Sequence, residues 1–132
     1  MILALDVGNT HIVMGCMEGR AIRYRCRLAT NRLATGAEYA VTISRLLEFA
    51  HIAPDAFDGA ILSSVVPQVD RALREAVRML TGVEAMVVDS TIRSDLTVLL
   101  DDPSTLASDL LVAAVGALDV SQPPLILIDM GT

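Results

Sequence analysis

The sequence contains no lysine and no tryptophan, and aromatic residues make up only 3% of its 132 residues. All ten basic residues are therefore arginine. The absence of lysine excludes a lysine-bearing phosphate loop, a Schiff-base lysine and a protein-kinase lysine within this chain. The core must be built from aliphatic side chains, which are plentiful because hydrophobic residues make up 53% of the sequence.

Cysteines and long apolar runs are also scarce. The two cysteines, Cys16 and Cys26, are too few for a disulfide framework. We expect them on neighbouring strands as small core residues, with nucleophilic catalysis as the alternative. No uncharged apolar run reaches the roughly 18 residues that a transmembrane helix needs. No basic segment precedes the first apolar run, so no signal peptide is expected and the predicted location is cytoplasmic.

The size and net charge of the chain limit the classes of protein to which it can belong. At 132 residues it suits one domain of ordinary size. The formal net charge is −6. Nucleic acids and anionic membranes attract basic surfaces, so this balance argues against both as partners.

The first residues of the chain form the stretch around which the rest is organised. An apolar run at residues 2–5 predicts a buried strand that ends at Asp6. Gly8, Asn9 and Thr10 then predict a tight turn, in which glycine adopts positive φ freely and asparagine tolerates it. Such a turn can present backbone N–H groups and a hydroxyl to a phosphate, while the neighbouring carboxylate holds a hydrated cation. The alternative is an ordinary hairpin in which Asp6 and Asn9 only cap the turn.

The end of the sequence repeats this pattern. Residues 125–132 read LILIDMGT, so a second apolar run delivers Asp129 into a turn that contains Gly131 and Thr132. An internal repeat indicates duplicated architecture. Two such turns that face each other are the layout of the actin-like kinase fold, in which a nucleotide lies between two related halves.

Four blocks together resemble the type III pantothenate kinase family. They are DVGNTHIV at residues 6–13, SSVVP at 63–67, DDPSTLASDLLVAAVGA at 101–117 and LILIDMGT at 125–132. The resemblance implies an α/β fold, a ribonuclease H-like (actin-like ATPase) domain with a mixed sheet and flanking helices. It also implies a domain at residues 1–120, followed at 121–132 by the first strand and phosphate turn of a second domain. The chain would then be the amino-terminal half of the enzyme.

The pattern of apolar residues predicts the elements between these blocks. In residues 21–28, Ile22, Tyr24, Cys26 and Leu28 alternate with three arginines, which indicates a half-buried strand. We interpret the arginine stripe as a solvated face, with phosphate contact as the alternative. The remaining expected strands are 12–17, 60–62, 84–88 and the closing run from 125, with 96–100 extended. The expected helices are 36–50, 67 to about 81, and 105–118, the last with Ser104 as N-cap and with Leu106, Leu110, Ala113, Ala114 and Ala117 buried.

The resemblance also implies an activity and a set of site residues. The activity is phosphoryl transfer from ATP to pantothenate, with Asp109 as general base, in a homodimer that binds pantothenate at the subunit interface. Asp6 would organise Mg²⁺ and Asp129 would hold K⁺ or NH₄⁺. ATP would contact Asp6, Val7, Gly8, Asn9, Thr10, His11, Ile12, Val13 and Thr132. Pantothenate would contact Leu100, Ala107, Ser108, Asp109 and Leu110.

Three positions depart from the family pattern, and two other functions stay open. Leu100 stands where the family usually has a tyrosine, Ala107 where it has a glycine and Leu110 where it has an arginine. Pantothenate would therefore be bound without the usual tyrosine and arginine side chains. Its position alone indicates that Asp109 is a surface carboxylate near a helix N-terminus. The other readings are a different actin-like phosphotransferase, such as a sugar or acetate kinase relative, and a non-enzymatic regulatory or filament-forming module.

Overall fold

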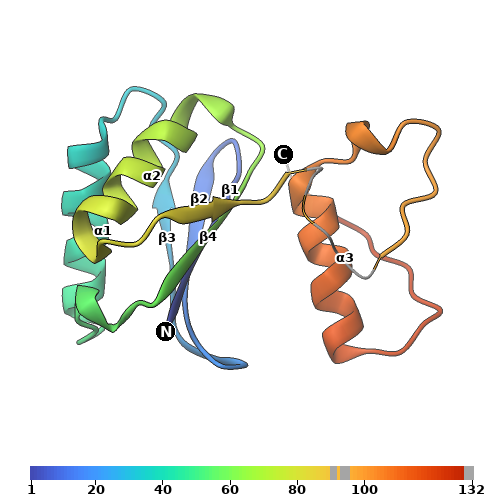
Figure 1. Ribbon diagram of the computed structural model, residues 1–132, viewed down its shortest axis with the longest axis horizontal. Coiled ribbons are helices and arrows are strands. Elements are labelled where there is room, and N and C mark those ends of the chain that lie inside the picture. Colours follow the sequence, from blue (N-terminus) through green and yellow to red (C-terminus); the bar gives the residue numbers. More distant parts are fainter. Residues whose placement is uncertain (90–91, 93–95, 130–132) are drawn as a thin grey trace.

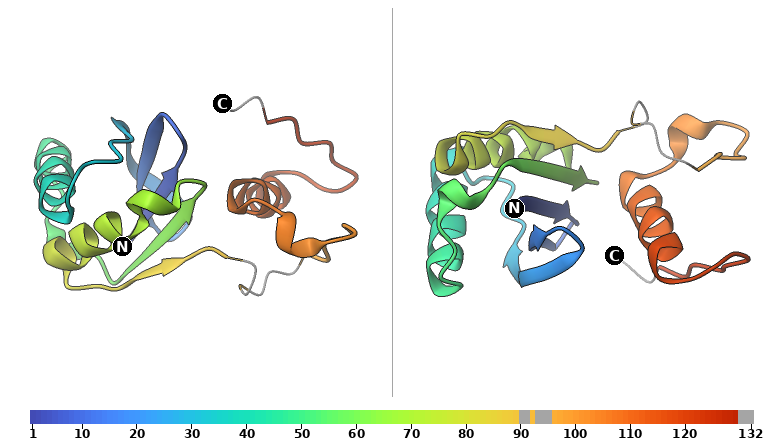
Figure 2. Two further views of the ribbon diagram at one scale, coloured as in Figure 1. Left: turned by 90° about the horizontal axis from the view of Figure 1, so that it is seen from above. Right: turned by 60° about the horizontal axis from the view of Figure 1, so that its bottom comes forward.

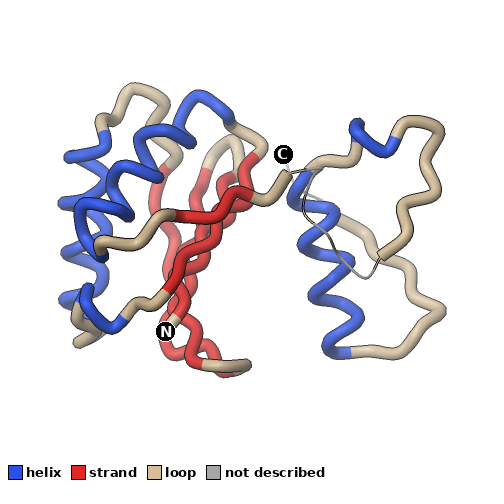
Figure 3. The backbone as a smooth tube through the Cα atoms, viewed as in Figure 1, coloured by secondary structure: helices blue, strands red, loops and turns tan. Residues whose placement is uncertain are grey.

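The computed structural model describes residues 1–89, 92 and 96–129. A mixed five-stranded sheet lies at the centre, with helices α1 and α2 on one side and α3 on the other (Figures 1 and 3). The strands are β1 (Ile2–Val7), β2 (His11–Glu18), β3 (Ala21–Ala29), β4 (Gly59–Ser64) and β5 (Ala85–Val87). The helices are α1 (Gly36–Phe49), α2 (Pro67–Thr81) and α3 (Ser108–Val120), with short 3₁₀ turns at Pro54–Ala56 and Pro103–Thr105.

The order of strands in the sheet is β3-β2-β1-β4-β5. The β1–β2 and β2–β3 pairs are antiparallel, whereas β4 runs parallel to both β1 and β5. The predicted mixed sheet with flanking helices is therefore confirmed. Because β1 is central and pairs with β2 and β4, its carboxyl end lies beside the β1–β2 turn and the SSVVP segment.

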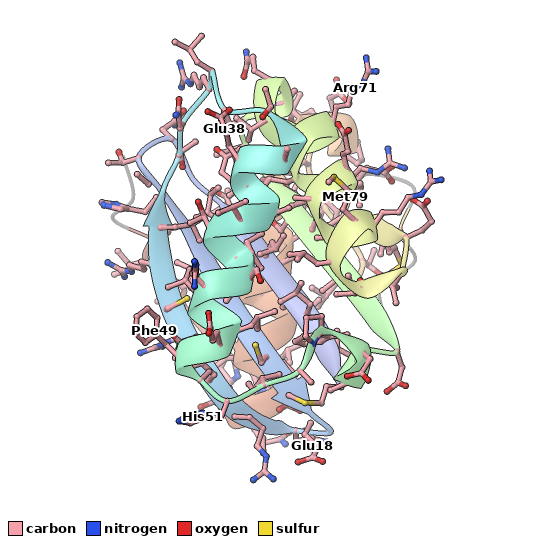
Figure 4. All side chains as sticks on the ribbon, turned by 90° about the vertical axis from the view of Figure 1, so that its left-hand side faces the viewer. Glu18, Glu38, Phe49, His51, Arg71 and Met79 are labelled. Carbon is pink, nitrogen blue, oxygen red and sulfur yellow. The ribbon has the colours of Figure 1, made fainter. Side chains whose placement is uncertain are left out.

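The hydrophobic core lies between the sheet and the layer of α1 and α2. Alternate residues of β1 and β2 point into it, as the period of a half-buried strand requires. Its largest fully buried side chains are Leu3, Val7, Ile12, Met14, Cys16, Ile43, Leu47, Leu62, Val66, Val69, Leu73 and Val77. Phe49 and Met79 lie on the outer faces of α1 and α2 (Figure 4) and are 80% and 59% exposed.

Local sequence signals define both helices of this layer. Thr35 and Glu38 form a reciprocal capping box at the start of α1, in which each side chain bonds to the other's backbone N–H. Pro67 occupies the first turn of α2, and Gly82 ends it with a left-handed φ of 72°. Among the described residues, no helix has the length and apolar character needed to cross a bilayer.

The prediction for β3 is wrong at one residue. Tyr24, Cys26 and Leu28 are buried or half-buried as predicted, but Ile22 is 58% exposed. The register between β2 and β3 shifts between Cys16 and Met17, so the two strands differ by one residue there. An inserted residue reverses the alternation of side chains between the two faces of the sheet on its far side. This reversal explains the exposure of Ile22.

The two cysteines lie on neighbouring strands, as predicted. Cys16 on β2 is fully buried and Cys26 on β3 is half-buried. Burial raises the pKa of the Cys16 thiol to about 11, and the nearby Cys26 adds to the shift. Burial also raises the pKa of Cys26, although a hydrogen bond with Tyr24 opposes the change. Thiols protonated in this way are poor nucleophiles, so the structure favours a packing role for both.

Helix α3 differs from its prediction in both start and burial. It begins at Ser108 with Ala107 at the N-cap position, so the predicted N-cap Ser104 falls in the preceding 3₁₀ turn. The five side chains expected in the core are not buried, and Leu110 is 45% exposed. The reason is that α3 is separated from β4 and β5 over much of its length. An apolar cavity of about 730 Å³ lies between them, lined among others by Ile61, Met86, Leu111 and Val115.

The predicted closing strand is absent from the described part of the chain. Residues 125–129 are exposed and have no strand assignment, with Ile126 90% and Ile128 81% exposed. Residues 96–100, which were predicted to be extended but not to form a strand, lie in a loop outside the sheet, and Leu99 is 91% exposed. A strand needs a hydrogen-bonding neighbour, and no described segment pairs with either run.

Candidate active site

The turn between β1 and β2 is tightly closed. The Gly8 N–H donates a hydrogen bond of 3.0 Å to the carbonyl oxygen of His11. A Cβ at Gly8 would lie 3.2 Å from that same oxygen. Gly8 is therefore needed for close backbone approach and not, as predicted, for positive φ, because the described glycines with positive φ are Gly19 and Gly82.

The residues after β3 hold this turn from the side. The backbone N–H of Thr30 donates to the carbonyl oxygen of Thr10 at 3.0 Å, and its hydroxyl donates to the carbonyl oxygen of Gly8 at 2.7 Å. Arg32 donates to the Asn9 side-chain oxygen at 3.0 Å. These hydrogen bonds reach the turn at Gly8, Asn9 and Thr10, so its backbone is held in position before any ligand binds. Thr30 and Arg32 are not among the site residues predicted from the sequence.

A pocket of about 260 Å³ opens beside the turn. It brings together carboxylates from three segments that are far apart in the sequence, namely Asp6, Asp109 and Asp129. The other lining residues are Val7, Gly8, Asn9, Thr10, His11, Val13, Arg27 and Val65. Figure 2 shows the β1–β2 turn directed towards the part of the molecule that contains α3. Most of the predicted nucleotide-contacting residues thus share one site with the predicted base.

Asp6 lies at the centre of this site. It is in register with Val13 of β2 on one side and with Ser63 of β4 on the other. Partial burial raises the pKa of its carboxyl group above the usual value, and the negative charges of Asp109 and Asp129 raise it further. A hydrogen bond from Ser63 acts in the opposite direction. The pocket therefore concentrates negative charge, which a bound cation would relieve.

Two serines fix the start of α3 against the sheet. The Ser108 hydroxyl donates to the carbonyl oxygen of Ser64 at 3.0 Å, and the Ser63 hydroxyl oxygen lies 3.3 Å from that of Ser108. The Asp109 carboxylate accepts the N–H of Leu110 at 2.8 Å. These contacts place the first turn of α3 at the carboxyl end of β4, so Asp109 reaches the pocket beside Asp6.

The other predicted site residues lie elsewhere. The Ile12 side chain is fully buried in the core behind the turn. Leu100 and Leu110 are 49% and 45% exposed and do not line the pocket, while Ala107 is the N-cap of α3. Thr132 lies outside the described residues. Asp129 does line the pocket, but it is exposed and does not end a buried strand.

The metal-ligating capacity of the described residues suits a cation shared with a substrate. Within the ranges given above, no group of three or more His, Cys, Asp or Glu side chains could hold a metal ion by itself. Mg²⁺ in phosphate-transferring sites is usually held by one or two carboxylates, with substrate phosphates and water completing its shell. Asp6 lines the pocket beside the turn and fits that arrangement as the carboxylate ligand.

A search of solved structures identifies the fold. The crystal structure of a ROK hexokinase from Thermus thermophilus matches with a TM-score of 0.51 and 16% identity, over 67% of this chain and 35% of that one. At this identity the likeness concerns the fold alone. It confirms the predicted actin-like ATPase architecture.

Comparisons of sequence identify the family. Type III pantothenate kinases from Bifidobacterium animalis subsp. lactis (strain AD011) and Phenylobacterium zucineum (strain HLK1) are 37% and 40% identical to the chain over all 132 residues. The chain covers 52% and 51% of these two proteins, so it spans about half the length of the curated relatives that it matches. A family model described as type III pantothenate kinase matches residues 2–132. The chain therefore belongs to the type III pantothenate kinase family.

Proposed function

We propose that the protein carrying this chain transfers the terminal phosphoryl group of ATP to the primary hydroxyl of pantothenate, giving 4'-phosphopantothenate in coenzyme A biosynthesis. The observation that supports this most is the single pocket shared by the β1–β2 turn, Asp6 and Asp109. Phosphoryl transfer depends on positioning and charge stabilisation more than on covalent help from the protein. A rigid turn beside a cluster of carboxylates suits both needs.

The turn would bind the phosphates of ATP. Backbone N–H groups of a tight turn form a concave donor surface for oxyanions, and the Thr10 hydroxyl adds a further donor. The bonds from Thr30 and Arg32 hold this surface in place, so little ordering is required on binding. Asp6 would hold Mg²⁺ against the phosphates, and bound Mg²⁺ would neutralise part of their charge.

Asp109 would act as the general base. It reaches the pocket from the first turn of α3, and the Ser108 contacts to Ser63 and Ser64 set its position. In this role its carboxylate accepts the proton of the pantothenate hydroxyl as that oxygen attacks the terminal phosphorus. Ala107 and Ser108, which precede Asp109 in the sequence, would contact pantothenate. Leu100 and Leu110 would contribute only apolar contacts, since neither can pair with the pantothenate carboxylate.

The remaining parts of the proposal concern ions, domains and assembly. Asp129 would hold K⁺ or NH₄⁺ beside the nucleotide, and Thr132 would touch ATP. Residues 1–120 would form the first domain, and 121–132 would begin a second domain that completes the nucleotide site. The working enzyme would be a cytoplasmic homodimer. Membership of the family and the half-length coverage of its relatives support these assignments.

A coupled assay of ADP release tests the function. The protein as its gene encodes it should release ADP only when pantothenate, ATP and Mg²⁺ are all present, and mass spectrometry should identify 4'-phosphopantothenate. The 132-residue chain by itself should show no measurable turnover, because it spans about half the length of its relatives. ADP release that ignores pantothenate would contradict the proposal.

A further inference from the structure

Among the arginines that the structure describes, Arg27 lines the pocket containing Asp6, Asp109 and Asp129. It extends from β3, at the edge of the described sheet, and its side chain is exposed. The sequence pattern places it in a stripe with Arg23 and Arg25, which we interpreted as a solvated face with phosphate contact as the alternative. The proposed function does not use it, although it faces the same space as the β1–β2 turn.

Strand register explains why Arg27 reaches this space. Arg27 is paired with Val13 of β2, and Val13 is paired with Asp6 of β1. Directly paired residues on neighbouring strands point to the same face of a sheet. Arg27, Val13 and Asp6 therefore form one row across the face that α3 approaches, and two strand spacings of roughly 4.8 Å each separate the ends of the row. A long guanidinium side chain spans much of that distance.

The charges around the pocket indicate what Arg27 can bind. Among the described residues, its charged lining consists of three carboxylates and one guanidinium. ATP would bring several more negative charges, which a single Mg²⁺ beside Asp6 cannot neutralise fully. A guanidinium is always charged and can donate two parallel hydrogen bonds to a phosphate. Arg27 is thus placed to supply positive charge from the side of the turn opposite Asp109.

The other arginines of β3 lack this position. Arg23 pairs with Glu18 at 2.7 Å and lines no pocket described here. Arg25 lines a different, mainly apolar hollow, which Asp6, Val13 and Val112 also line but which the described residues of the β1–β2 turn do not reach. The same strand therefore supplies a matched control, because Arg23 has the same side chain but a different environment.

We infer that Arg27 is a phosphate-contacting residue, whose guanidinium binds phosphate oxygens of the nucleotide in the pocket shared by Asp6 and the β1–β2 turn. This inference rests on the proposed function, since it assumes that a nucleotide occupies the pocket. It adds a residue that neither the motifs nor the assigned roles include. Phosphate and carboxylate are both oxyanions, and we assign Arg27 to the nucleotide phosphates and not to the carboxylate of the acceptor.

Direct binding tests this inference without any turnover. Calorimetry on the protein as its gene encodes it would compare Mg·AMP-PNP, Mg·tripolyphosphate and adenosine as probes, in wild type and in Arg27→Gln, Arg27→Lys and Arg23→Gln. We expect Arg27→Gln to weaken both phosphate probes about 10- to 100-fold, as loss of a charge-assisted hydrogen bond implies. Adenosine affinity should be unchanged. The affinity of Arg27→Lys for the phosphate probes should lie between those of wild type and Arg27→Gln, because lysine keeps the charge but loses the paired donors. Arg23→Gln should bind all the probes as wild type does.

Several results would overturn the inference. They are full affinity of Arg27→Gln for both phosphate probes, equal losses in Arg23→Gln, or a rise in the KM for pantothenate with unchanged binding of Mg·AMP-PNP. A wild type that fails to bind Mg·AMP-PNP would also overturn it. Thermal unfolding of each variant controls for misfolding. If wild type binds the phosphate probes in an Arg27-dependent way but shows no pantothenate-dependent ADP release, the proposed function fails and the role of Arg27 stands.

Discussion

The hydroxyl of Thr30 donates a hydrogen bond of 2.7 Å to the carbonyl oxygen of Gly8. Together with the 3.0 Å bond from the Thr30 N–H to Thr10, it links the end of β3 to both sides of the β1–β2 turn. The turn is thus supported by the third strand of the sheet as well as by its own hairpin. This support holds the backbone of the turn in place, and the residues of the turn line the pocket that also contains Asp6 and Asp109.

Replacing Thr30 by valine should impair phosphate binding by the turn. Valine keeps the shape but leaves the Gly8 carbonyl without this donor, so we expect kcat/KM for ATP to fall by about tenfold or more. Thr30→Ser should retain most of the wild-type kcat/KM for ATP, because serine keeps the hydroxyl. Steady-state kinetics at saturating pantothenate gives the comparison. Equal activity in all three proteins would mean that the turn holds its shape without Thr30.

Asp109→Asn should abolish most turnover while leaving substrate binding largely intact. A general base typically contributes about 10²–10⁴-fold to the rate, and asparagine cannot accept the proton. Asp119→Asn is a suitable control, because Asp119 lies on the same helix but outside the pocket and pairs with Arg20. Rapid-quench kinetics and calorimetry would separate chemistry from binding. A near-normal kcat in Asp109→Asn would require another base, with Asp6 and Asp129 as the candidates.

Ser108→Ala should act through Asp109 without removing any catalytic group. It deletes the bond to the Ser64 carbonyl oxygen and the contact with the Ser63 hydroxyl, so the first turn of α3 loses its direct polar connection to β4. We expect kcat to fall by roughly tenfold with little change in the KM for ATP, and Ser108→Thr to recover activity. An increase in the KM for ATP with unchanged kcat would instead place Ser108 in nucleotide binding.

The parts of the fold that could be predicted from the sequence are those with local signals. The β1–β2 hairpin, α1 and α2 follow from short apolar periods, a capping box at Thr35 and Glu38, and the stop at Gly82. Asp6 and Asp109 could be proposed from motifs that resemble a family. The structure then brought both into one pocket, which no local pattern of residues could demonstrate.

The features that could not be predicted from the sequence depend on neighbours that are distant in the sequence. The apolar run at residues 125–129 has the composition of a strand, but no described segment pairs with it. Ile22 is exposed because of a register shift between two strands, which alternation alone does not reveal. Arg27 lies in the pocket because of a row of pairings across three strands. Its sequence surroundings resemble those of any solvated strand face.

Asp6→Asn should stabilise the protein in the absence of divalent cations while removing activity. The pKa of Asp6 is raised above its ordinary value of 3.8, so the folded state holds a proton more readily than the unfolded state. Stability from this group is therefore present at low pH and declines as pH rises through the raised pKa. At neutral pH asparagine avoids that penalty, and the variant should unfold at a higher temperature than wild type.

The stability difference between Asp6→Asn and wild type should change with pH and with Mg²⁺. It should vanish below the ordinary pKa of 3.8, where both states of wild type carry a protonated Asp6. Mg²⁺ should stabilise wild type more than the variant, because binding to the folded state shifts the equilibrium. Asp55→Asn, an exposed change in the 3₁₀ turn before β4, is the control. A lower unfolding temperature for Asp6→Asn at neutral pH without Mg²⁺ would show that the Asp6 carboxylate is stabilising.

The final prediction concerns Asp129 and monovalent cations. Asp129 is exposed, so the cost of burying a lone carboxylate does not require an ion there. The reason to expect one is its place in a pocket with Asp6 and Asp109, where three negative charges would repel the phosphates of ATP. We expect the rate to rise with K⁺ or NH₄⁺ in a sodium buffer of constant ionic strength. Asp129→Ala should lose both this dependence and most activity, whereas Asp119→Asn should keep them. A flat response of wild type to K⁺ would show that Arg27 and Mg²⁺ suffice to neutralise the pocket.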